Sequence, residues 1–503
     1  MITYKWLKIE KPNDFDQLIA IVPKEYDPKM VASELKASIA PTVCAVLVEL
    51  GYIDKDYRST YYKFYAKKGR EYRDDCVRIH LFDDAVSFSE NPIDIHIEGY
   101  NDRDDDDDEQ RDKTEHHYFG YVVLRPTLVS TIGRSIVSPR ARSDARGSLV
   151  GAYHQVHVLG RKLRVWGFPS MAQHTDISVC AHVSCWAILR HLSERFSQHR
   201  EWLIHDITMM AQPFDPGGLR PSYGLDILEA ERIFQAAGTF PLIVSKDGAN
   251  DTKFYVQMLA YLESGFPLFV AMEGMGHAVV VVGFKRRDVS FPLAGKAGST
   301  WDQIESLLVV DDNLLPYATV PLTKPNKTTQ LTPTYGADQF DRFIVALPEK
   351  IFYPAEAVER ASTQFIATFG KIAGLPDQDK LIRRSFVTTI SALRRFARKR
   401  LSELGAELVD LIMRLETAQF LWIVEYATAE QWRAGHISAR VVLDATASIK
   451  DSIPYWFAHD ENQATVFDRG IEAGDAQTLD LNRPPSTPLG RMEQNLRPVI
   501  NPR

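Results

Sequence analysis

Apolar and polar positions along residues 1–125 predict a mixed α/β unit. A helix-like pattern runs from about Pro28 to Leu50 and stops at Gly51, a residue type that commonly ends helices. Runs rich in β-branched and aromatic residues predict three strands, at Val77–Phe82, Ile93–Ile97 and Tyr118–Leu124. Residues 126–150 are rich in Arg, Ser, Gly and Pro, which predicts a linker or a strap across the surface.

Residues 151–350 show a second pattern, in which helical segments are followed by strongly apolar strands. A hairpin is predicted at Val156–Trp166, and a helix is predicted to begin at Cys180 and end near Phe196. Two further helices are expected within Gly224–Gly238 and Phe254–Glu263. Strands are then expected at Pro267–Ala271, Ala278–Val282 and Leu307–Val310.

Residues 351–467 are predicted to form a helical region followed by a β-hairpin. The helical pattern runs from about Pro354 to Leu415, and the two strands are expected at Phe420–Glu425 and Ala439–Asp444. The helical region carries a basic cluster, interpreted as a solvated helix face, with an acidic partner as the alternative. Its members are Arg383, Arg384, Arg394, Arg395, Arg398, Lys399 and Arg400. Residues 468–503, which include Arg483-Pro-Pro-Ser-Thr-Pro, predict a poorly ordered tail.

Composition narrows the class of protein. A chain of 503 residues exceeds what one core supports, so about three domains are expected. The balance of 59 basic against 66 acidic residues argues against nucleic acid as a partner. No stretch has the 18 or so apolar residues of a membrane span, and the N-terminal sequence lacks a signal-peptide pattern. With only four cysteines, we expect a cytoplasmic protein without disulfides or membrane attachment, and the oligomeric state stays open.

An acidic run at Asn101–Glu109 precedes His116 and His117. Carboxylates and imidazoles are common metal ligands, so a metal site is one interpretation of this segment. A run of like charges more often marks a solvated surface loop, and we adopt that interpretation. We therefore expect neither a metal nor a cofactor.

A cysteine at the start of a helix is the strongest chemical signal in the chain. Cys180 lies where a polar segment gives way to an apolar helical run, so the helix dipole favours its thiolate form. The side-chain amide of Gln173 is a candidate hydrogen-bond donor to an oxyanion. His277 precedes one apolar strand and Asp311 ends the next, so they are a candidate base and its orienting group.

This Gln–Cys–His–Asp order resembles papain-like cysteine peptidases, and most closely the branch that processes bacteriocin precursors after double-glycine leaders. The resemblance covers about residues 165–320 and includes the run Leu262–Ala271 and the segment Gly276–Gly283. It implies a papain-like domain at 151–350, in which the central helix packs on an antiparallel sheet. With its flanking units, the chain is predicted to have an α+β fold. The resemblance also implies a thiol hydrolase that cleaves a peptide or isopeptide bond in a protein substrate.

Several alternatives remain open. Asp312 and Asn313 compete with Asp311 for the third position of the triad, because strand ends cannot be located to the residue. Cys185 projects about 140° around the helix from Cys180 and is expected to face the core. Ala181 stands where the resembling family usually has glycine, directly after the nucleophile.

Two alternative functions use the same domain: a transglutaminase-like acyl transferase, and a papain-like domain that binds without catalysis. The flanking regions carry further expectations. Residues 1–125 are expected to select or gate the substrate. The polar insertion Lys285–Glu305 is expected to form a mobile lip beside the cleft.

Overall fold

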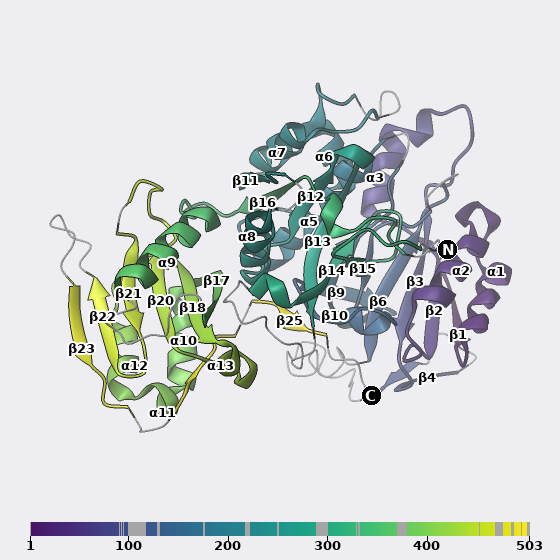
Figure 1. The fold of residues 1–503 in the computed structure, drawn as a ribbon. Helices are drawn as coiled ribbons and strands as arrows, with labels where there is room; N and C mark the ends of the chain where they lie inside the picture. The colour runs from purple at the N-terminus through teal and green to yellow at the C-terminus, as the bar shows by residue number, and fades with distance from the viewer. Residues whose placement is uncertain are drawn as a thin grey trace.

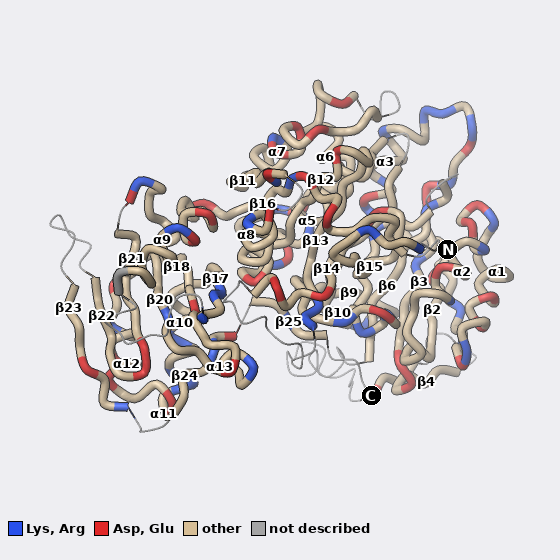
Figure 2. Tube along the Cα trace, viewed as in Figure 1, with Lys and Arg blue, Asp and Glu red and all other residues tan. Residues whose placement is uncertain are grey.

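The computed structural model describes residues 2–89, 91, 93, 95–98, 117–127, 131–174, 177–216, 222–248, 251–287, 300–327, 329, 332–369, 380–451, 453–467, 476–483, 487–493 and 495–499. The structure is 32% helical and 34% strand, in agreement with the predicted α+β class. Three large antiparallel sheets follow one another from the N-terminal to the C-terminal part of the chain (Figure 1). Basic and acidic residues are interspersed along all three parts (Figure 2).

The first sheet has seven strands in the order β1-β2-β3-β6-β7-β10-β9. They are β1 (Thr3–Lys8), β2 (Ala45–Tyr52), β3 (Cys76–Phe82), β6 (Tyr118–Leu124), β7 (Ser135–Val137), β9 (Ala152–Val158) and β10 (Arg161–Ser170). Successive residues of a strand point to opposite faces, and both faces are buried at the central strands β3 and β6. Val46 and Val48 pack with α1 (Leu18–Ile21) and α2 (Pro28–Ser38). Ala45 and Leu47 pack with α3 (Lys55–Lys63) on the other face.

Two predictions for this region are wrong. The helix expected at Pro28–Leu50 ends at Ser38, and residues 45–52 form β2 instead. Because β2 is covered on both faces, its sequence is a continuous apolar run without the alternation that marks a half-exposed strand. Residues 126–150 are not a linker, since they contain β7 and β8 (Ser148–Leu149), and β8 pairs with β13 of the second sheet. The first sheet also includes β9 and β10, beyond the expected boundary at residue 150.

The second sheet has the order β11-β16-β12-β13-β14-β15. Its strands are β11 (Phe240–Ser245), β12 (Leu268–Met272), β13 (His277–Arg286), β14 (Ile304–Val310), β15 (Ala318–Pro321) and β16 (Arg342–Leu347). The helix predicted from Cys180 is confirmed as α5 (Cys180–Arg195), which contacts β12 and β13 of this sheet and β9 and β10 of the first. Beside it lie α6 (Ile204–Ala211) and α7 (Ile227–Ala236), whereas α8 (Thr252–Glu263) contacts β12 from the opposite face of the sheet. The shared core therefore fixes α5 between two sheets.

The third sheet has the order β17-β18-β20-β21-β22-β23. Its strands are β17 (Leu381–Thr389), β18 (Phe420–Thr428), β20 (Ala439–Asp444), β21 (Tyr455–His459), β22 (Gln463–Phe467) and β23 (Ala476–Asp480). Trp422 and Val424 pack toward the side of α9 (Ala355–Phe369) and the central core. Leu421 and Ile423 pack on the other face with α10 (Ile390–Lys399), α11 (Leu401–Leu404) and α12 (Ala406–Arg414).

Two expectations for the C-terminal part are wrong. The helical region is interrupted by β17, so Arg383 and Arg384 lie on a strand and not on the basic helix face. The two predicted strands are confirmed as β18 and β20, which pair antiparallel within a six-stranded sheet. The described residues of the expected tail include three strands, β23, β24 (Leu489–Gly490) and β25 (Arg497–Pro498). β23 pairs with β22, β24 pairs with β19 (His436–Ile437), and β25 pairs with β8. Isolated apolar residues such as Leu489 and Leu496 are buried there, a signal too sparse to outweigh the polar composition.

The remaining short elements are β4 (Val86–Phe88), β5 (Ile95–Ile97) and α13 (Ala429–Ala434). In the part of the chain that the structure describes, no helix combines the length and apolar composition needed to cross a bilayer. The acidic run Asn101–Glu109 and His116 lie outside the described residues, as do residues 288–299 of the expected lip.

Candidate active site

Cys180 is the first residue of α5 and is partly exposed. His182, two residues on, supports the start of the helix, because its Nδ1 accepts the backbone N–H of Val179 at 3.3 Å. Burial lowers the pKa of His182 to about 4, against the opposing charge of Asp215, so the ring is neutral and able to accept. Burial also raises the pKa of the Cys185 thiol, in agreement with its expected place in the core. His182 and Cys185 are therefore structural.

A tight turn brings Gln173 back to the start of this helix. His174 and Ser178 form an antiparallel bridge, in which the N–H of each donates to the carbonyl of the other at 2.8 Å. Gln173 and Val179 flank that bridge and are therefore neighbours. Gln173, Val179 and Cys180 all line one cleft. The bridge explains why a glutamine seven residues upstream can reach the cysteine.

His277 begins β13 at the same cleft. The loop from β12 ends at Gly276, whose φ of 61° lies in the left-handed region that favours glycine. The hydroxyl of Ser184 in α5 donates to the carbonyl of Ala278 at 3.4 Å, which fixes the first turns of the helix against this strand.

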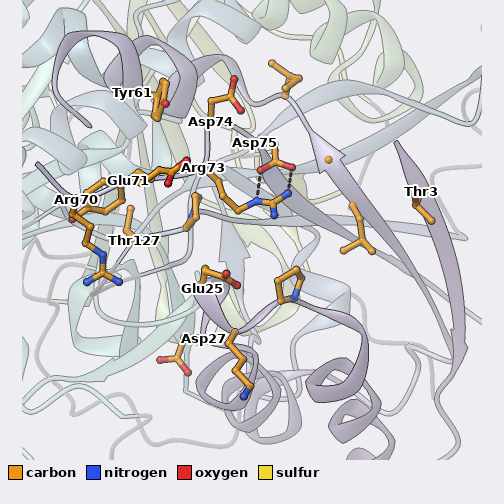
Figure 3. A pocket seen from close by; sticks show the side chains of 17 residues that line it. Thr3, Glu25, Asp27, Tyr61, Arg70, Glu71, Arg73, Asp74, Asp75 and Thr127 are labelled. Carbon is orange, nitrogen blue, oxygen red and sulfur yellow. Dashed lines mark hydrogen bonds and ion pairs between the residues drawn. The ribbon is translucent and has the colours of Figure 1, made fainter. Parts of the chain in front are cut away.

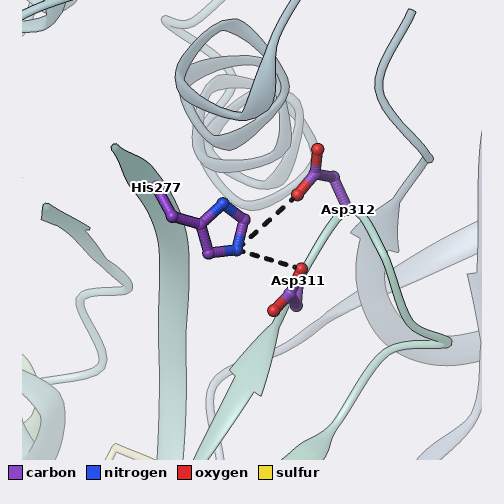
Figure 4. A group of neighbouring side chains, drawn as sticks. All are labelled: His277, Asp311 and Asp312. Atoms are coloured by element: carbon purple, nitrogen blue, oxygen red, sulfur yellow. Dashed lines mark hydrogen bonds and ion pairs between the residues drawn. The ribbon is translucent and has the colours of Figure 1, made fainter. Parts of the chain in front are cut away.

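Asp311 reaches His277 because β13 and β14 are antiparallel. Val280 pairs with Val310, so Asp311, which follows β14, comes opposite Val279, on the same face of the sheet as His277 two residues earlier. The distance from His277 Nε2 to Asp311 Oδ1 is 3.2 Å, and that to Asp312 Oδ1 is 3.9 Å (Figure 4). The other ring nitrogen points away from both carboxylates (Figure 4). Cys180 lies near enough to the ring to help raise the pKa of His277, and both residues line the cleft.

Asp311 accepts more hydrogen bonds than Asp312. Its Oδ2 accepts the hydroxyl of Tyr335 at 2.7 Å, and its Oδ1 accepts the backbone N–H of Asn313 at 2.9 Å. The side-chain amide of Asn313 donates to Asp311 at 3.1 Å and to Asp312 at 3.2 Å. Among the three candidates for the third position, Asp311 is therefore nearest the imidazole, and Asn313 orients both carboxylates.

These contacts separate the pKa values of the cluster. Burial favours the neutral form of His277, but hydrogen bonds to Asp311 and Cys180 and the charges of both aspartates outweigh it and raise the pKa to about 10. Burial opposes the ionised form of Asp311, but its hydrogen bonds and the charge of His277 lower the pKa to about 2. Burial and the neighbouring Asp311 raise the pKa of Asp312 to about 7. An imidazolium beside an ionised Asp311 is the resulting state near neutral pH.

The cleft itself has a volume of about 590 Å³. Cys180, His277 and Gln173 share it with apolar side chains that include Leu225 and Phe269. Asp311 lies behind His277 and is buried. Such a cleft has room for an extended segment of substrate, with the sulfur, the imidazole and the amide on its wall.

Tyr335 is the residue of this site that sequence reasoning missed. It lies in an irregular segment between β15 and β16, and its hydroxyl is 2.7 Å from Asp311. A lone tyrosine in a loop carries no motif, so only the tertiary fold identifies it.

A larger cavity, of about 1110 Å³, lies in the N-terminal part and contains none of the predicted site residues. Its wall is polar, and Arg73 and Asp75 form an ion pair on it (Figure 3). His117, from the segment considered for a metal, has its Nδ1 2.8 Å from Asp83 Oδ2. Over the described residues, one group of three side chains has ligand atoms close enough to hold a metal ion: His277, Asp311 and Asp312, within 4.8 Å of one another.

No protein-family model matches the chain, and neither a curated protein sequence nor a solved structure does.

Proposed function

We propose that this protein is a cysteine hydrolase with a papain-like core, which cleaves a peptide or isopeptide bond in a protein substrate. The observation that carries the proposal is the position of His277, which is hydrogen-bonded to Asp311 and shares the wall of a cleft with Cys180. A nucleophile, a base and a group that orients the base form the recurring unit of thiol catalysis. A helix that begins at the cysteine and packs on an antiparallel sheet supports the same proposal.

In the proposed reaction, the Cys180 thiolate attacks the carbonyl carbon, and the carbonyl oxygen becomes an oxyanion. The amide of Gln173 and the backbone N–H of Cys180 donate hydrogen bonds to it. The imidazolium of His277 gives its proton to the leaving amine as the C–N bond breaks, which leaves a thioester. His277 then takes a proton from water, whose oxygen attacks the thioester and releases the acid and the thiolate. Asp311 keeps the ring oriented throughout.

Two alternatives differ in one step each. In an acyl transferase, a primary amine replaces water in the attack on the thioester. In a binding domain no thioester forms. A small ester such as p-nitrophenyl acetate separates these cases, because release of nitrophenol reports acylation and added glycine ethyl ester reports transfer to an amine.

The proposal is tested first on the thiol itself. At pH 6, iodoacetamide should alkylate Cys180 far faster than Cys44, Cys76 or Cys185, as measured by peptide mass spectrometry. Burial raises the pKa of each of those three thiols. His277→Ala removes the imidazolium partner that favours the thiolate and should slow labelling of Cys180 about 100-fold.

Cys185→Ala is the matched control, since it removes a thiol from the same helix and should leave the labelling rate of Cys180 unchanged. Excess EDTA should also leave that rate unchanged. Equal, slow labelling of all four cysteines would overturn the proposal. Loss of acylation on chelation would instead favour a metal at His277, Asp311 and Asp312.

A further inference from the structure

Ala172, the residue before Gln173, forms hydrogen bonds to the N-terminal part of the chain through both its N–H and its carbonyl. The N–H of Ala172 donates to the carbonyl of Ile132 at 3.0 Å. The carbonyl of Ala172 accepts Nη2–H of Arg125 at 3.0 Å. Arg125 follows β6 directly, and its backbone N–H donates to the carbonyl of Thr131 at 2.7 Å. The approach to Gln173 is therefore built on the C-terminal end of β6 in the first sheet.

His174, the residue after Gln173, also contacts the N-terminal part of the chain, in this case through its side chain. The hydroxyl of Tyr65, which follows α3, lies 2.5 Å from Nδ1 of His174. Both side chains are buried, at 5% exposure each, so water competes little for this contact. Burial and the nearby charge of Arg125 hold the pKa of His174 well below its usual range. The ring is neutral, and its Nδ1 can accept the phenolic proton.

We infer that Tyr65 and Arg125 are positioning residues for the oxyanion hole, so that the N-terminal unit completes the active site instead of only selecting substrate. This inference rests on the proposed function. Gln173 lies between the two anchored residues, and its own loop closes on Val179 through the bridge between His174 and Ser178. An oxyanion donor must lie within a few tenths of an ångström of its place, so tight anchoring on both sides has a direct chemical consequence.

Two reactions of the same sulfur distinguish this role from a general structural one. Alkylation by iodoacetamide is a displacement at saturated carbon and forms no oxyanion. Acylation by p-nitrophenyl acetate passes through a tetrahedral oxyanion and needs the donor. A residue that acts through Gln173 must therefore slow acylation and leave alkylation unchanged.

The variant is Tyr65→Phe, which removes one hydroxyl and keeps the ring. We expect acylation of Cys180 to slow about five- to tenfold, the effect of one lost hydrogen bond. Gln173→Ala should slow it about 10²- to 10³-fold, as for loss of an oxyanion donor. Alkylation should keep the wild-type rate in both. Tyr118→Phe is the matched control, because Tyr118 is also buried and its hydroxyl lies 2.9 Å from Nδ1 of His80, at the opposite end of β6 from Arg125.

The double variant Tyr65→Phe/Gln173→Ala decides the route of the effect. If Tyr65 acts through Gln173, the double variant acylates at the rate of Gln173→Ala alone. Arg125→Lys, which keeps the charge but not the planar donor set, should repeat the Tyr65 pattern. The inference is overturned if Tyr65→Phe acylates at the wild-type rate, slows both reactions equally, or adds its full effect to Gln173→Ala. Failure of wild-type Cys180 to be alkylated would instead count against the proposed function itself.

Discussion

Two buried clusters of charge in this protein have opposite designs. The site cluster consists of His277, Asp311, Asp312 and Tyr335. The interface cluster consists of Glu263 of α8 and Arg286 of β13 with Arg384, Glu425 and Arg440 of the third sheet. Each contains two carboxylates, but the interface cluster supplies three guanidinium groups for them, whereas the site cluster supplies a single imidazole.

The two arginines of the third sheet each have several partners in the interface cluster. Arg384 donates to Glu263, to Glu425 at 2.9 Å and to the carbonyl of Met492 at 2.8 Å. Arg440 donates to Glu425 at 2.9 Å and to the carbonyl of Gly490 at 2.9 Å. Burial opposes the ionised form of Glu425, but the charges of Arg440 and Arg384 outweigh it and lower the pKa of that carboxyl. The cluster joins the second sheet, the third sheet and the C-terminal segment.

The site cluster has two carboxylates but only one group, the imidazole of His277, that can carry a positive charge. Oδ2 of Asp312 is buried and accepts no hydrogen bond from a described residue. Two aspartates next to each other cannot both ionise easily, which is why their pKa values separate to about 2 and about 7. The comparison teaches that burial alone does not mark a reactive site. The difference lies in whether the partners of each charge are complete.

The largest expected effect tests the interface cluster. Arg384→Met leaves Glu263 and Glu425 buried with fewer partners, and should lower the free energy of unfolding by about 3–5 kcal/mol. Its neighbour Arg383 forms a more exposed pair with Glu359, so Arg383→Met should cost less than about 1 kcal/mol. Urea unfolding followed by circular dichroism measures both. The alkylation rate of folded Cys180 should not change in either variant, and a slower rate in Arg384→Met would mean that the two clusters are coupled.

The second prediction tests the ionised partner of the base. Asp311→Asn removes a charge and a strong acceptor, both of which raise the pKa of His277, so that pKa should fall from about 10. The imidazolium then loses its proton at a lower pH, and the alkaline limb of the acylation profile should move to lower pH. At pH 6 we expect acylation to be about tenfold slower, equivalent to about 1.4 kcal/mol. Asp410→Asn, an exposed aspartate on α12, is the control, and superimposable profiles for Asp311→Asn and wild type would contradict the assigned role.

The sequence was most informative where chemistry and local structure coincide. The start of α5 at Cys180 was predicted to the residue, because the change from polar to apolar sequence is abrupt there. His277 and Asp311 were predicted because each adjoins a strongly apolar strand, and antiparallel pairing then brings them together. That Gln173 lies at the same cleft also agrees with its spacing from the cysteine.

The remainder depends on tertiary contacts that leave no local pattern. β2 was misassigned because a strand covered on both faces has the same composition as a buried helix. The polar composition of residues 126–150 predicts a linker, yet one of these polar residues, Arg142, is buried. Tyr65 contacts His174 across 109 residues of sequence, and Arg125 contacts Ala172 across 47 residues. No spacing rule joins residues across such distances.

The smallest expected effect concerns the unbalanced carboxylate. The folded protein raises the pKa of Asp312 from 3.8 to about 7, so between these values the folded state binds more protons than the unfolded state. Stability therefore falls as pH rises through this range, and the ionised carboxylate is a cost above it. Asp312→Asn resembles the protonated side chain in shape and can still accept from the amide of Asn313.

We expect Asp312→Asn to melt at a higher temperature than wild type at pH 8, by about 2 °C for a gain of about 1 kcal/mol. The difference should shrink at pH 4.5, where the wild-type carboxyl is protonated in the folded state. Alkylation of Cys180 should be nearly unchanged, because Asp311 remains the nearer partner of His277. A variant that is less stable than wild type at pH 8 would show that Asp312 is paired after all, and the contrast between an unbalanced site and a balanced interface would then be lost.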